Sequence, residues 1–201
     1  MALFTGPMGP FGWQFQDYQF SAAGSNKASF EFVNAAHFTT NTVAHRVTFW
    51  HIVPQTDDTE IYCNLTVDGG TGWVAGTEYA TYLPTITGDA LAVIADDSAG
   101  DSEFHIAGIA AASAGMDSTA TTGGAAGSFI ITGISQGTDV GHMWGLSQLH
   151  VAAGGVTTAQ VPMGVYETVT AHNGLRLIAN SGGIDGHVML EGLVVPLETG
   201  L

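Results

Sequence analysis

The chain has 201 residues, 45% of them hydrophobic, which is enough for one substantial core or two small ones. Lys27, Arg46 and Arg176 are its only basic residues against 18 acidic ones, so the net charge is −15. Binding of nucleic acid or of an anionic membrane depends on clustered Lys and Arg, and we therefore expect neither as a partner.

Charged residues make up only 10% of the chain, whereas about a quarter is usual. Small neutral side chains must therefore cover much of the surface, or neighbouring proteins must, as in a subunit of an assembly. No apolar run approaches the roughly 20 residues of a membrane span. The start, MALFTGPMGPFGW, lacks the basic segment of a signal peptide, which predicts synthesis in a cytoplasm without secretion.

Residues 1–42 are predicted to form an N-terminal arm and the first strands. Gly and Pro in TGPMGPFG exclude a helix and favour an extended chain. The arm is rich in aromatic residues, which make efficient protein contacts. It either completes the local core as a strand or docks onto a neighbouring subunit, and the candidate interaction residues are Phe4, Phe11, Trp13 and Phe15.

The remaining chain alternates short β-branched and aromatic runs with Gly, Asn, Asp and Thr clusters, and helical periodicity is absent almost everywhere. This pattern predicts an all-β protein, a β-sandwich resembling a jelly roll. The expected strands are Trp13–Phe20, Ser29–Asn34, Val43–Val53, Glu60–Val67, Glu78–Leu83, Ala90–Ala95, Glu103–Ile109, Ser128–Ile134, Met143–Val151, Val161–Val169, Leu175–Ala179 and His187–Val195.

Two related five-strand halves are predicted, residues 43–109 and 128–201. Aligning Glu60–Gly108 with Trp144–Gly192 without a gap gives about ten identities, and LAVIADDSAGD then pairs with LRLIANSGGID. The halves are expected to be two sheets of one sandwich or two tandem domains. Residues 110–127, AAASAGMDSTATTGGAAG, offer no side chain larger than Met116 and are predicted to be a flexible crossover that has no anchor in a core.

Other chemical motifs are weak. Cys63 stands alone in the strand-like IYCNLTV, which predicts a buried thiol. Gly133–Gly137 matches the G-x-S-x-G nucleophile elbow around Ser135, but the glycine-rich segment that follows cannot form the helix such an elbow requires. No reaction is indicated, and we expect a protein that is not an enzyme and carries no cofactor.

The segment VIADDSAGDSEFHIAG packs the carboxylates of Asp96, Asp97, Asp101 and Glu103 into eight residues. Their spacing differs from that of an EF-hand loop, although oxygens in a curled loop would still suit calcium. In the aligned copy, Asn180, Ser181, Asp185 and His187 stand at the same places, so the shared features are those of a turn. The segment is therefore predicted first as a hairpin connector, with calcium as the weaker alternative.

The Lys-poor, Ala/Gly/Thr/Ser-rich β-chain and its closing GHVMLEGLVVP resemble virion structural proteins of tailed bacteriophages, in particular capsid decoration (cement) proteins. The resemblance is diffuse and carries no functional residue over. It implies a homo-oligomer, often a trimer, bound to the major capsid protein on the capsid exterior. Alternatives are a tail-tube, fibre or other head-tail subunit, or a carbohydrate- or calcium-binding jelly roll with Trp50, Trp73 and Trp144 as sugar-stacking faces.

Overall fold

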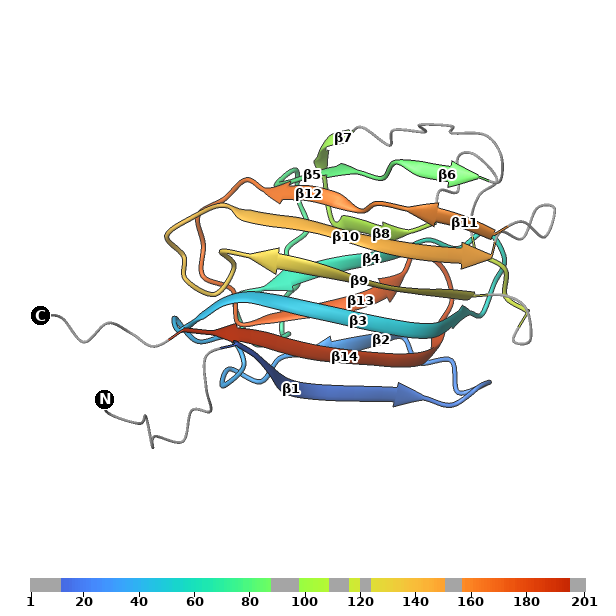
Figure 1. Ribbon diagram of the computed structural model, residues 1–201, viewed down its shortest axis with the longest axis horizontal. Helices are drawn as coiled ribbons and strands as arrows, with labels where there is room; N and C mark the ends of the chain where they lie inside the picture. The colour runs from blue at the N-terminus through green and yellow to red at the C-terminus, as the bar shows by residue number, and fades with distance from the viewer. Residues whose placement is uncertain (1–11, 88–97, 109–115, 120–123, 151–156, 196–201) are drawn as a thin grey trace, which may run out of the picture.

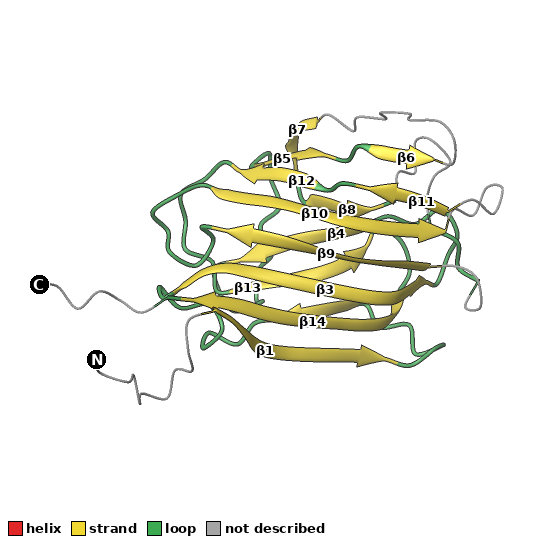
Figure 2. Cartoon of the chain, viewed as in Figure 1, coloured by secondary structure: helices red, strands yellow, loops and turns green. Residues whose placement is uncertain are grey.

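A computed structural model describes residues 12–87, 98–108, 116–119, 124–150 and 157–195. Its secondary structure within these ranges is entirely β, which confirms the all-β prediction (Figure 2). The strands are β1 (Gly12–Ser21), β2 (Ser29–Phe32), β3 (Thr42–Pro54), β4 (Ile61–Thr66), β5 (Tyr79–Tyr82), β6 (Thr85–Thr87), β7 (Ser98–Asp101), β8 (Phe104–Ala107), β9 (Gly124–Thr132), β10 (Gly141–His150), β11 (Thr157–Gln160), β12 (Met163–Tyr166), β13 (Gly174–Ala179) and β14 (Ile184–Val194).

The strands form two antiparallel sheets that lie one behind the other (Figure 1). The larger sheet has ten strands in the order β1-β14-β3-β9-β10-β12-β5-β7, with β11 paired to β10 and β6 paired to β11. The smaller sheet has the order β2-β13-β4-β8. This two-layer arrangement confirms the predicted β-sandwich, whereas the jelly-roll order stays a prediction.

The core lies between the two sheets. It is formed by alternate residues of each strand, because successive side chains of a strand point to opposite faces. Phe30, Leu65 and Leu177 of the smaller sheet and Phe129 and Leu190 of the larger one are almost completely buried in a single cluster. Cys63 is also fully buried there, as predicted, and burial raises the pKa of its thiol.

Strands from the two predicted halves share both sheets. In the larger sheet β3 lies between β14 and β9, and in the smaller one β13 lies between β2 and β4. The halves are therefore neither one sheet each nor two tandem domains. The aligned strands β4 and β10 also lie in different sheets, so the proposed internal repeat does not extend to the arrangement of the strands.

Met116 corrects the prediction for residues 110–127. Its side chain is fully buried, and its backbone pairs with Thr59 in an isolated β-bridge. Residues 124–127 belong to β9 rather than to a linker. The buried Met116 side chain and the hydrogen bonds of Asp117 to His150 and of Ser118 to Asp57 thus tie the described part of this small-residue segment to the sheets.

Two prolines interrupt the strands at the β5 end of the larger sheet. Pro162 separates β11 from β12, and Pro84 separates β5 from β6, because proline has no N–H to donate to the ladder. The two breaks lie side by side, since the Val161 N–H donates to the Pro84 carbonyl at 3.0 Å. The sheet therefore continues across the break as two shorter pairs of strands.

Candidate interaction surface

The outward side of the ten-stranded sheet, which faces away from the smaller sheet, is the most unusual surface among the described residues. We call it the outer face. Its side chains are assigned by cross-strand pairing and by their alternation with buried residues. The larger or more polar of them are Trp13, Phe15, Tyr18 and Phe20 on β1, His187, Met189, Glu191 and Leu193 on β14, Arg46, Thr48 and Trp50 on β3, Ala126, Ser128 and Ile130 on β9, His142, Trp144, Leu146 and Gln148 on β10, Met163 and Val165 on β12, Tyr82 on β5, and Ile86 on β6.

One row of directly paired residues crosses seven strands of this face. It reads, from β1 to β5, Phe15, Glu191, Arg46, Ile130, Trp144, Met163 and Tyr82. Phe15 is 65% exposed, Trp144 48% and Tyr82 45%. Large apolar side chains in a monomer are usually exposed singly, whereas contiguous ones mark interaction sites. The outer face therefore has the character of an interface rather than of a solvated sheet.

A second row of directly paired residues lies next to the first on the same face and ends in Leu146, which is 54% exposed. It runs Tyr18, Met189, Thr48, Ser128 and Leu146 from β1 to β10. Because β9 and β10 lie near the middle of the strand order, Leu146 and Trp144 occupy the central part of the face.

Aromatic rings gather around His187 at the β1 side of the face. The imidazole lies parallel to the Trp50 ring, with centroids 5.3 Å apart and planes 3° apart, and stacks on Phe20 at 4.6 Å. The Tyr18 hydroxyl and His187 Nδ1 are hydrogen-bonded at 2.5 Å. These contacts hold four rings from three strands in a fixed arrangement that still leaves Phe20 54% exposed.

The outer face carries one acidic and one fully basic side chain, and they are paired. Arg46 Nε donates to Glu191 Oε2 at 2.7 Å, and this hydrogen bond raises the pKa of Arg46. The guanidinium also lies over the Trp13 ring, 4.7 Å from its centroid. The face is thus close to neutral on a chain whose net charge is −15.

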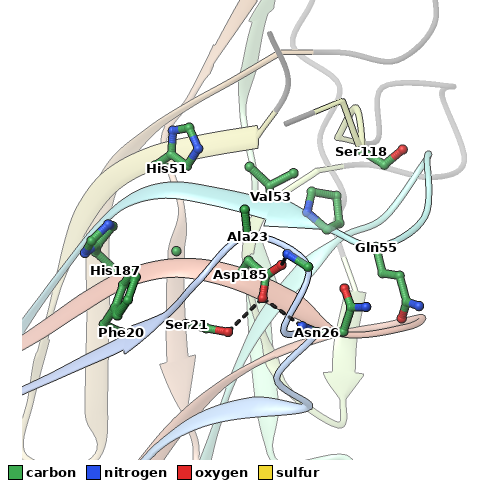
Figure 3. Close-up of a pocket in the computed structure, with 13 residues that line it drawn as sticks. Phe20, Ser21, Ala23, Asn26, His51, Val53, Gln55, Ser118, Asp185 and His187 are labelled. Atoms are coloured by element: carbon green, nitrogen blue, oxygen red, sulfur yellow. Dashed lines mark hydrogen bonds between the residues drawn. The ribbon is translucent and has the colours of Figure 1, made fainter. Parts of the chain in front are cut away.

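A cavity of about 380 Å³ borders the aromatic cluster (Figure 3). Phe20 and His187 stand on one side of it, and His51 lies above. Asp185, in the middle of the view, accepts hydrogen bonds from Ser21 Oγ, the Gly24 N–H and the Asn26 N–H at 2.6–2.8 Å. Because its carboxylate is already engaged by three donors, Asp185 fixes the loop after β1 rather than offering a free ligand.

A bulge in β3 shapes this cavity. The register of β3 shifts between Phe49 and Ile52, and His51 has a φ of 53°, in the left-handed region that non-glycine residues rarely adopt. Gly186 lies opposite, where an added Cβ would stand 2.4 Å from the His51 carbonyl oxygen. The bulge therefore requires glycine at position 186, and it turns His51 away from the core.

The predicted arm residues divide at Gly12. Phe4 and Phe11 lie outside the described residues. Trp13 and Phe15 belong to β1, an edge strand that pairs over its whole length with β14. This placement agrees with the predicted strand Trp13–Phe20, and the side chains of Trp13 and Phe15 join the outer face. Their contact with a neighbouring subunit stays a prediction.

The four acidic candidates are not brought together as a site among the described residues. Asp96 and Asp97 lie outside them, and Asp101 ends β7. Glu103 follows, and its carboxylate accepts a hydrogen bond from Ser102 Oγ. In the part of the chain that the structure describes, no three His, Cys, Asp or Glu side chains are grouped to hold a metal. Calcium binding stays a prediction without support from the geometry.

The first strand of the predicted hairpin, Ala90–Ala95, lies outside the described residues, so the hairpin stays a prediction. Ser98–Asp101, however, form the strand β7 rather than part of a turn. β7 pairs with β5 in the larger sheet, whereas β8 pairs with β4 in the smaller one. The chain therefore crosses from one sheet to the other between Asp101 and Phe104. Its aligned counterpart, the turn after Ala179, also joins strands of different sheets, β13 and β14.

Ser135, the serine of the G-x-S-x-G motif, has a histidine partner that its sequence neighbourhood did not reveal. His45 Nε2 and Ser135 Oγ are 2.7 Å apart. His45 is completely buried and Ser135 is 4% exposed, and the His45 Nδ1 atom has no hydrogen-bond partner. Burial lowers the pKa of His45 to about 3. Both side chains are shielded from a substrate, and no carboxylate of the described ranges orients the imidazole, so the geometry here is that of a buried structural contact.

The three tryptophans proposed as sugar-stacking faces have different surroundings. Trp73 is covered on one side by the Arg176 guanidinium, 4.5 Å from the ring centroid. Trp50 is stacked against His187, and Trp144 stands in the middle of the outer face. They do not form one platform.

No protein-family model matches the chain, and no curated protein and no solved structure is significantly similar to it. The described residues contain no helix of the length and hydrophobicity that a membrane crossing needs. The interpretation of the outer face therefore depends on its own chemistry.

Sequence reasoning named Trp144 only as a sugar-stacking candidate and missed three of its neighbours on the face, Leu146, Met163 and Tyr82. A pattern was available in GHMWGLSQLH, where Trp144 and Leu146 alternate with the buried Met143, Ser147 and Leu149. An apolar residue on both sides of one strand indicates that both faces of its sheet are covered.

Proposed function

We propose that the chain is a structural subunit of a virion, of the capsid decoration (cement) type, which binds the outer capsid surface and stabilises it. Its partners in this proposal are further copies of itself and the major capsid protein. The observation that supports the proposal is the outer face, where a row of paired residues from Phe15 to Tyr82 crosses seven strands and is apolar except for the ion pair of Arg46 and Glu191. A subunit that is normally covered by neighbours accounts for such a face, and a free-standing monomer does not.

Composition supports the same proposal. A chain with 10% charged residues and a net charge of −15 is a poor binder of packaged nucleic acid and fits the exterior of a particle. A subunit that stabilises a capsid passively needs contact area that becomes buried on binding, and it needs no catalytic or cofactor site. The resemblance to decoration proteins implies a trimer, and this number of copies stays a prediction.

Binding to capsids lacking the subunit tests the proposal. Purified protein is incubated with such capsids from the virus that encodes it, and bound protein is quantified after sedimentation. We expect saturable binding to the capsid surface and a higher temperature of capsid disruption. Deleting residues 1–11 should lower occupancy while the circular dichroism spectrum keeps its β form, if the predicted arm anchors the subunit. Absence of binding by the full-length chain contradicts the proposal.

A carbohydrate-binding module is the second candidate, because Trp144 and Trp50 are 48% and 38% exposed on the outer face. Sugar rings stack on exposed aromatic faces of this kind. A glycan array separates the two functions: specific glycan binding that Trp144→Ala abolishes, together with no capsid binding, favours the module.

A further inference from the structure

The exposed apolar area of the outer face matches what one partner contributes to a stable protein interface. Its nine most exposed large side chains are on average nearly half exposed, with Phe15 at 65% and Met163 at 37% as the extremes. A side chain of this size has roughly 200 Å² of surface, so together they present about 800 Å². A standard interface buries about 800 Å² on each partner.

The kinds of residue on the face are also those of interface cores. Interfaces are enriched in Trp, Tyr, Phe, Met and Arg and depleted in Lys, Glu and Asp. The outer face has seven Trp, Tyr and Phe residues, two methionines, and a single acid, Glu191, which Arg46 neutralises at 2.7 Å. A basic partner would find no unpaired carboxylate to recognise on this face.

The net charge of the chain, compared with the nearly neutral outer face, indicates which partner binds this face. Two copies of a chain with net charge −15 repel one another, and they approach most easily through a surface without unpaired acids. The outer face is such a surface. We infer that the outer face binds the outer face of a second copy, so that two ten-stranded sheets pack face to face about a two-fold axis.

Geometry is consistent with this packing. Two sheets stacked on each other lie about 10 Å apart with their strands roughly aligned, and their facing side chains interdigitate. A two-fold axis through the middle of the face, near β9 and β10, brings Trp144 and Leu146 of both copies to the centre. Residues at the centre of an interface usually contribute most of its binding energy.

The inference names the partner of the surface on which the proposed function rests, but its test needs no capsid. The sedimentation equilibrium of the purified full chain is measured at micromolar concentration. We expect a mass of twice 20.7 kDa for the wild type. Leu146→Glu should weaken dimerisation by about thirtyfold or more, because it places two like charges at the buried centre.

Ser128→Lys is the second disruptive variant, since Ser128 pairs directly with Leu146 across the strands and its side chain is only half-buried. Val67→Glu is the matched control: Val67 is 48% exposed in the turn after β4, outside the outer face, and a charge there should leave the dimer intact. All variants must retain the wild-type circular dichroism spectrum and melting behaviour to be compared.

A wild-type monomer or trimer overturns the inference, as does a folded pair of Leu146→Glu and Ser128→Lys variants that dimerise as tightly as the wild type. These failures are distinct from failure of the proposed function. A monomer that still binds capsids overturns the dimer alone, and a dimer that binds no capsid overturns the virion role alone.

Discussion

Replacing His45 should remove a large part of the acid sensitivity of the protein. The His45 ring is completely buried between the Phe38 ring, 4.4 Å away, and Ser135 Oγ, and its pKa is lowered to about 3, chiefly by burial. In the unfolded chain the pKa of a histidine is about 6.5. Between these two values the unfolded chain binds one more proton, so acid favours unfolding.

The stabilisation from neutral His45 is therefore fully present above about pH 6.5 and is lost as the pH falls toward 3. At pH 5 the loss amounts to about 2 kcal/mol relative to pH 7. His172 is also buried, and burial lowers its pKa too, so its contribution has the same sign.

Urea unfolding at pH 7 and pH 5, at one fixed protein concentration, measures this effect. We expect His45→Gln to be less stable than the wild type at pH 7 but to lose about 2 kcal/mol less between the two pH values. Cys63→Ala, another fully buried change with no group that titrates in this range, serves as the control and should keep the wild-type pH dependence. Equal pH dependence of His45→Gln and the wild type would refute the reasoning.

Three further predictions concern the interior. Asp185→Ala should destabilise the fold by about 2–4 kcal/mol in denaturant unfolding, because it leaves the donors of Ser21, Gly24 and Asn26 without their carboxylate; an unchanged midpoint would contradict the tethering role. Met116→Ala should lower the free energy of unfolding by about 2–5 kcal/mol, the range for truncating a fully buried Met. A decrease below about 0.5 kcal/mol, which is typical of a surface substitution, would show that Met116 does not anchor its segment. Cys63 should react with a thiol reagent only after unfolding, and rapid labelling of the native protein would disprove its burial.

The sequence predicted the fold class because short β-branched and aromatic runs recur between turn-forming residues, and because β3 alternates buried Val47 and Phe49 with the more exposed Arg46 and Thr48. It missed β6, β7 and β11, which have three or four residues each and owe their pairing to neighbouring strands rather than to their own pattern. It also overlooked Met116, because a composition of small residues hides the effect of one long side chain.

The candidate surface was predictable only in part. Trp13 and Phe15 were identified as candidate contact residues and placed in a strand, but the sequence did not show that this strand lies at the edge of the sheet with its aromatic side chains on the outward side. The row from Phe15 to Tyr82 depends on the order of seven strands, and strand order is set by long-range pairing that no local pattern specifies.

Hydroxyl-radical footprinting of the side chains tests most directly whether the outer face is covered by another protein. The wild type and the Ser128→Lys variant are oxidised at the same concentration, and the modification rate of each residue is compared by mass spectrometry. We predict that Trp144 and Phe15 react several times more slowly in the wild type, while Val169, which is 53% exposed outside this face, reacts equally in both. Equal rates at Trp144 and Phe15 in the two proteins would contradict the account.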